Sequence, residues 1–94
     1  MVRGRGGALT DPDGWRIEIR PAALKALRRL GRRDRERIST AIGALPKGDV
    51  KLLRGPERLW RLRVGDWRVI FDRLDAERVI DVLAIRPRGR AYDR

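Results

Sequence analysis

The 94-residue chain contains neither cysteine nor histidine. Without cysteine it forms no disulfides and offers no thiolate nucleophile, and cysteine usage says nothing about its redox compartment. Without histidine it lacks the usual general base at neutral pH and the commonest metal ligand in proteins. Any chemistry that this protein performs therefore uses other residue types.

Long apolar stretches are also missing. The longest, VIDVLAI at residues 79–85, is too short to span a membrane and is interrupted by Asp81. The first 14 residues are basic, but no hydrophobic stretch follows them, so we expect no secretory signal. These features predict a soluble cytoplasmic protein without a membrane partner.

Acidic residues are few compared with basic ones. The chain has 13 Asp and Glu against 24 Lys and Arg, a formal net charge of +11, and all the basic residues except Lys25, Lys47 and Lys51 are arginines. An arginine-biased genome explains most of the preference for arginine over lysine, but it does not explain the net charge. A charge of this size attracts polyanions, above all nucleic acid, or an acidic protein partner.

The first half of the chain predicts a strand and two helices. Residues 1–14 are rich in glycine and predict a flexible arm, followed by a single domain over residues 15–94. Alternation over residues 15–19 predicts a short strand. Pro21 suits the first turn of a helix that Gly31 ends, and Asp34 is placed to cap a second helix that ends at Pro46. The short connection predicts a helical hairpin.

The second half predicts three strands. Residues 46–58 are rich in turn formers and indicate a loop. Strands are expected over residues 59–64, 67–71 and 79–85, and the nearly continuous apolar run of the last is typical of a central strand. The order β-α-α-β-β-β predicts an α+β fold in which the helices cover one face of an antiparallel sheet and leave the other face open.

The segment WRLRVGDWRVIF, residues 60–71, predicts a hairpin whose turn has Gly65 and Asp66 at its centre. In this register three apolar pairs share one face: Val64 with Trp67, Leu62 with Val69, and Trp60 with Phe71. The other face carries Arg61 opposite Ile70 and Arg63 directly opposite Arg68. Like charges in directly opposed positions destabilise a sheet by about 0.2–1 kcal/mol. Stability alone would favour glutamate or threonine at one of these positions.

Two interpretations of this arginine face are available. Long arginine side chains often extend into water on an exposed sheet and screen one another. However, the basic tail that follows the predicted central strand carries Arg86, Arg88, Arg90 and Tyr92. Converging arginines beside a tyrosine form a surface that binds phosphates and stacks on bases. We therefore predict a nucleic-acid-binding face, with Arg54, Arg86 and Arg90 as binding residues.

The chain resembles the RelE/ParE superfamily of type II toxin–antitoxin toxins from about Trp15 to its C-terminus. The resemblance is carried by LLRGPERLWRLRVGDWRVIFDR, by DVLAIRPRG, and by the tyrosine that follows. It implies the same β-α-α-β-β-β order, with a small twisted antiparallel sheet and a helical hairpin on one side. In the RelE-like branch it further implies an endoribonuclease that cuts mRNA in the ribosomal A site and is neutralised by a cognate antitoxin.

The resemblance also implies catalytic positions, which fall on Arg61, Arg63, Arg68, Arg88 and Tyr92. The reaction would be attack of a ribose 2′-hydroxyl on the adjacent phosphate. Arginines suit the neutralisation of the transition state, but they stay protonated, which makes them poor general bases. The family often has lysine at the positions of Arg61 and Arg63, and sometimes histidine at that of Pro87. Tyr92 is a candidate for base stacking or proton transfer, or else packs on the sheet edge.

Neither a metal nor another cofactor is implied, because no cluster of carboxylates accompanies the arginines. Two alternatives to the nuclease stay open: a ParE-like toxin that binds DNA gyrase and has no nuclease activity, and an inactive or purely RNA-binding relative. For either kind of toxin we expect the partner to be an antitoxin with an acidic, partly disordered segment, encoded by a neighbouring small acidic reading frame.

Overall fold

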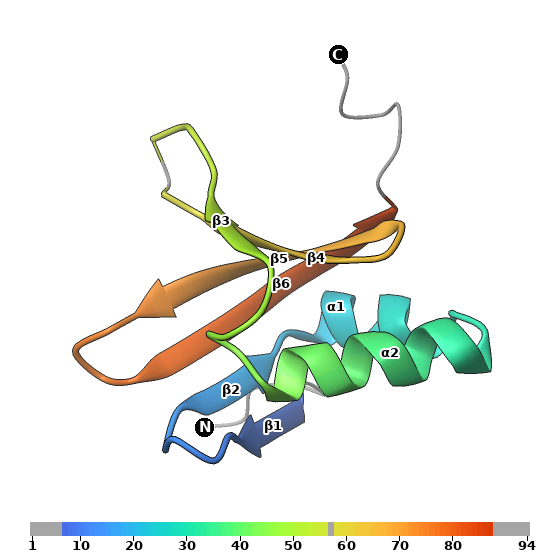
Figure 1. Ribbon diagram of the computed structural model, residues 1–94, viewed down its shortest axis with the longest axis horizontal. Helices are drawn as coiled ribbons and strands as arrows, with labels where there is room; N and C mark the ends of the chain where they lie inside the picture. The colour runs from blue at the N-terminus through green and yellow to red at the C-terminus, as the bar shows by residue number, and fades with distance from the viewer. Residues whose placement is uncertain (1–6, 57, 88–94) are drawn as a thin grey trace.

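The computed structural model describes residues 7–56 and 58–87 and consists of one sheet with two helices packed against it (Figure 1). The strands follow the order β1-β2-β6-β5-β4-β3 across the sheet. The elements are β1 Gly7–Thr10, β2 Arg16–Ile19, α1 Pro21–Arg28, α2 Arg32–Gly43, β3 Val50–Leu52, β4 Trp60–Val64, β5 Trp67–Leu74 and β6 Val79–Pro87. The predicted α+β class is confirmed.

The two helices pack against the same face of the sheet, as predicted. Pro21 is the first residue of α1, where its missing N–H removes no helical hydrogen bond. The buried stripe of α2 is formed by Ile38 and Ile42, which lie one turn apart. The prediction that Asp34 caps α2 is wrong, because Gly31 is the N-cap residue and makes no side-chain cap. The carboxylate of Asp34 instead accepts a hydrogen bond of 3.2 Å from Nε1 of Trp67.

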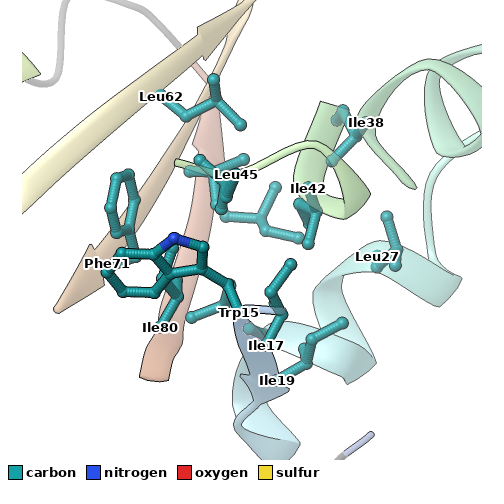
Figure 2. Packing of buried hydrophobic residues seen from close by; sticks show 14 residues of the cluster. Trp15, Ile17, Ile19, Leu27, Ile38, Ile42, Leu45, Leu62, Phe71 and Ile80 are labelled. Carbon is teal, nitrogen blue, oxygen red and sulfur yellow. The ribbon is translucent and has the colours of Figure 1, made fainter. Parts of the chain in front are cut away.

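The hydrophobic core fills the space between the sheet and the helices (Figure 2). Ile17, Leu62 and Phe71 contribute from the strands and meet Ile38 and Ile42 of α2, all with at most 1% exposure. Burying a side chain of this size contributes about 1.5–3 kcal/mol. Since alternate residues of a strand point to opposite faces, this core fixes which side chains point away from the helices.

One end of the core is closed by aromatic rings and guanidinium groups. The guanidinium carbon of Arg73 lies 5.4 Å from the ring centre of Trp15 and 5.3 Å from that of Trp60. Arg78 covers Trp15 as well, at 5.5 Å. Arg73 also forms an ion pair of 2.8 Å with Asp75. These two arginines therefore have a structural role at the end of the sheet away from the β4–β5 turn.

The sheet confirms the predicted hairpin and differs from the prediction in the direction of β2. The β4–β5 register pairs Val64 with Trp67 and Trp60 with Phe71, as expected, and β6 lies in the middle of the sheet. However, β2 runs parallel to β6, so the sheet is mixed and not purely antiparallel.

Two further strands form in segments that were predicted to lack them. Residues 7–10, assigned to the flexible arm, form β1 and pair with β2, and residues 50–52, assigned to a loop, form β3 and pair with β4. Both are short edge strands that form because an adjacent strand offers its unpaired backbone groups. The rest of the predicted arm, residues 1–6, lies outside the described residues. None of the described helices has the length and apolar character that crossing a membrane requires.

Candidate nucleic-acid interface

Three arginines lie side by side on the face of the sheet that points away from the helices. Arg63 of β4 pairs with Arg68 of β5, and Arg68 pairs with Arg86 of β6. Directly paired residues point to the same face, and the adjacent residues Leu62 and Val69 are buried on the helix side. We refer to Arg63, Arg68 and Arg86 as the arginine row. The structure thus confirms the predicted Arg63–Arg68 pair and adds Arg86 in the same register.

The charge of this row is concentrated. Neighbouring strands are about 4.8 Å apart, so the three side chains start from closely spaced positions. Arg63 and Arg86 are exposed, and neither forms an ion pair with a carboxylate of residues 7–56 and 58–87. Like charges so arranged destabilise the sheet, whereas a bound polyanion relieves the repulsion and accepts charge-assisted hydrogen bonds.

Arg61 lies on the same face one step farther from the turn, but its environment differs. It pairs with Lys51 of β3 and Ile70 of β5, and only 12% of its side chain is exposed. Its Nη1 lies 3.8 Å from Oδ1 of Asp49 and has no hydrogen-bond partner among the described residues. Arg61 therefore adds positive potential to the face from a largely covered position, which the sequence pattern did not predict.

The opposite end of the same face is acidic. Asp72 of β5 pairs with Asp81 of β6, and Asp81 pairs with Glu18 of β2. We refer to Glu18, Asp72 and Asp81 as the acidic row. Arg16 lies 2.9 Å from Glu18, and Arg20 lies 3.0 Å from Asp81. The open face is thus divided, with the arginine row beside the β4–β5 turn and the acidic row at the opposite end.

Helix α2 holds this turn from the other side of the sheet. Gly65 has φ +59°, as the first central residue of a type II′ turn requires. A Cβ atom at Gly65 would lie 2.9 Å from Nη2 of Arg37, so this guanidinium rests against the turn. The Trp67–Asp34 hydrogen bond provides a second contact. Sequence reasoning assigned no such role to Asp34 or Arg37, because helical periodicity does not show which strand a helix will contact.

The remaining predicted residues lie elsewhere. Arg54 is exposed in the connection between β3 and β4 and does not belong to the arginine row. Arg88, Arg90 and Tyr92 lie outside the described residues. The described part of the chain contains no group of three or more Asp, Glu, His or Cys side chains placed to hold a metal ion.

The sequence matches the family model described as ParE toxin of type II toxin–antitoxin system, parDE, over residues 17–92. The chain belongs to the ParE toxin family. The predicted membership of the RelE/ParE superfamily is thereby confirmed, and the protein is a type II toxin–antitoxin toxin. A search of curated proteins gave no significant match.

Solved structures of RelE proteins resemble this ParE-family toxin. One is an archaeal RelE–RelB complex from Pyrococcus horikoshii OT3, whose matching chain is 33% identical, with a TM-score of 0.67 over 81% of this chain and 97% of that chain. Another is the isolated RelE toxin of E. coli, 21% identical, with a TM-score of 0.62 over 82% of this chain and 89% of that chain. The second similarity concerns the fold alone.

Proposed function

We propose that this toxin is an mRNA endoribonuclease that acts in the ribosomal A site, without a metal ion, and uses the arginine row to bind the scissile phosphate. The observation that carries the proposal is the alignment of Arg63, Arg68 and Arg86 on the open face of the sheet. A toxin that only needed a stable sheet would gain from an opposite charge or a neutral residue in this row.

The proposed reaction is attack of a ribose 2′-oxygen on the adjacent phosphorus. The 2′-O–P bond forms and the P–O5′ bond breaks, which leaves a 2′,3′-cyclic phosphate and a 5′-hydroxyl end. The 2′-hydroxyl loses its proton, and the departing 5′-oxygen gains one. Guanidinium groups stabilise the extra negative charge on the phosphate oxygens during this step, and their planar donors hold the phosphate in one orientation.

The residues divide into three roles in this proposal. Arg63, Arg68, Arg86 and Arg88 bind the phosphate, and Arg61 raises the positive potential from its covered position. Arg54 and Arg90 bind the neighbouring part of the RNA. Tyr92 is the candidate for proton transfer, because a phenol titrates near pH 10 whereas a guanidinium does not titrate in this range.

We further propose that a cognate antitoxin neutralises the toxin. The RelE chain from P. horikoshii is found in a complex with RelB, and the present chain covers 97% of its length. An acidic segment of the antitoxin would be attracted to the arginine row, where it would exclude RNA. Co-expression with the neighbouring small acidic reading frame is expected to restore the growth of cells that express the toxin.

The function is tested by inducing the toxin in bacteria and mapping the 5′ ends of cellular mRNA. We expect new ends inside translated codons, and we expect them to disappear in Arg68→Ala and Arg88→Ala variants. Arg16→Ala is the matched control, since Arg16 is an exposed arginine of the same sheet that lies beside the acidic row. It should cut as the unmodified toxin does.

Two outcomes would reject the nuclease. A DNA-damage response with intact mRNA would favour the gyrase-directed alternative that membership of the ParE family also allows. Normal growth on expression of the toxin alone, with the folded protein shown to be present, would indicate an inactive or purely RNA-binding protein.

A further inference from the structure

We propose that a single-stranded RNA bound at the arginine row continues over the β4–β5 turn onto α2, where Arg33 and Arg37 bind its flanking phosphates. We refer to Arg33 and Arg37 as the turn-side arginines. The inference rests on the proposed function for the identity of the ligand. It adds a second binding surface on α2, on the helix side of the β4–β5 turn.

The position of Arg37 is the first observation. Its Nη2, Nη1 and Cζ atoms lie 2.9, 3.2 and 3.3 Å from the place where a Cβ of Gly65 would be. The guanidinium thus touches the tip of the hairpin, and the start of α2 lies beneath this tip in Figure 1. Asp34, one helical turn earlier, accepts the hydrogen bond of Trp67 and keeps α2 at this place.

The second observation is that the charges of the turn-side arginines are not compensated. Arg32 lies 3.3 Å from Glu36, and Arg35 donates a hydrogen bond of 3.1 Å to the carbonyl oxygen of Leu30. Arg33 and Arg37 are exposed, and no carboxylate of the described part of the chain forms an ion pair with them. They are four residues apart, which makes them neighbours on the helix surface.

The third observation is the direction that the charges define. Arg61 and Arg63 are two positions apart in β4, a step of about 6.8 Å toward the turn, and Gly65 begins the turn just after the strand ends. A phosphate chain that follows β4 in this direction passes Arg63 and reaches Arg37 at the tip. In the other direction it would approach the acidic row, which repels it. The charge pattern therefore leads RNA over the turn.

The experiment measures the binding of fluorescent single-stranded RNA to the full-length toxin as a function of salt. All riboses carry 2′-O-methyl groups, so no attacking hydroxyl is present and binding is separated from cleavage. One RNA has about 12 nucleotides and the other about 4, two lengths within the range of single-strand site sizes. For single strands the slope of log K against log salt changes by about 0.7 for each phosphate contact.

With the longer RNA, we expect Arg37→Gln to reduce the steepness of this slope by about 0.7, and the Arg33→Gln/Arg37→Gln variant to reduce it by roughly twice as much. The shorter RNA should show no change, since it fits on the open face. Arg37→Lys should restore the slope because the charge is retained. Arg16→Gln, the matched control, should leave both slopes unchanged, and thermal unfolding will confirm that each variant is folded.

An unchanged slope for the longer RNA in folded double-variant protein would overturn this inference and leave the nuclease proposal intact. If the double variant instead weakened only the binding of a poly-glutamate peptide, the turn-side arginines would belong to an interface with an acidic protein segment, which also overturns the inference. If the unmodified toxin bound neither RNA, both this inference and the proposed RNA-binding function would fail.

Discussion

The arginine row shows how much of a site a short sequence pattern determines. The Gly65-Asp66 pair fixes a two-residue turn, and the turn fixes which residues face each other, so the Arg63–Arg68 pair could be predicted. The burial of Arg61 could not be predicted, because it depends on how other segments fold against β4. Strand alternation assigns a residue to a face, but it does not say what covers that face.

The repulsion within the row predicts a gain in stability when one charge is removed. Arg63→Gln should raise the free energy of unfolding by about 0.2–1 kcal/mol, because Arg63 directly faces Arg68. The gain should shrink at high salt, where exposed charges are screened. Urea unfolding followed by tryptophan fluorescence at low and high salt measures both effects.

Arg16→Gln is the control for this measurement. Arg16 pairs with Thr10 and Val79 across the strands and forms an ion pair with Glu18, so its loss relieves no repulsion between directly opposed arginines. If Arg63→Gln proved no more stable than Arg16→Gln, the row would not be strained, and the stability argument for a binding role would be lost.

Among the elements, those with strong local patterns were predictable and those that depend on a partner were not. The β4–β5 hairpin and the core-facing stripe of α2 follow from periodicity within one segment. Strands β1 and β3 contain no buried residue, so they show no alternation of buried and exposed positions. The parallel pairing of β2 with β6 joins segments some sixty residues apart in the sequence. Its direction depends on how the whole sheet packs, which no local pattern shows.

The contact between α2 and the hairpin makes Gly65 sensitive to substitution for two reasons. Gly65→Ala places an L-residue at φ +59° and sets its Cβ within 2.9 Å of Arg37. The backbone term alone should cost about 1–2 kcal/mol. Arg37→Ala removes the side chain that the new Cβ would approach. The free energy of unfolding of the Gly65→Ala/Arg37→Ala variant should therefore exceed, by about 0.5 kcal/mol or more, the value expected from adding the effects of the two single substitutions. Additive effects in urea unfolding would show that Arg37 does not rest on the turn.

The hydrogen bond from Trp67 to Asp34 is the other link between these elements. Trp67→Phe retains most of the ring packing and removes the donor, so it should lower the free energy of unfolding by about 0.5–1.5 kcal/mol. Asp34→Asn keeps an acceptor oxygen and should have a smaller effect. Equal losses in the two variants, measured by thermal unfolding, would mean that the negative charge in the first turn of α2 matters more than the hydrogen bond.

At the scale of the whole molecule, the net charge of +11 is distributed unevenly. The arginine row and the turn-side arginines gather at the β4–β5 turn, while the acidic row lies at the other end of the open face. Composition alone indicated a polyanionic partner but gave no location for it. The location depends on strand register and helix packing, which join residues from α2, β4, β5 and β6.

This distribution predicts how association with the proposed antitoxin depends on salt. Oriented charge accelerates encounter, whereas short-range contacts determine how long a complex lasts. The association rate constant of toxin and antitoxin should therefore fall by roughly tenfold or more between low and physiological ionic strength, with a much smaller change in the dissociation rate constant. Stopped-flow fluorescence of the toxin's tryptophans measures the association rate constant. The dissociation rate constant is measured with a fluorescently labelled toxin that is displaced from the complex by excess unlabelled toxin.

Arg63→Gln should reduce the salt dependence of association more than Arg16→Gln does, since Arg63 lies in the arginine row and Arg16 lies beside the acidic row. Equal effects of the two variants would mean that the toxin attracts its antitoxin through net charge alone, without orientation by the arginine row.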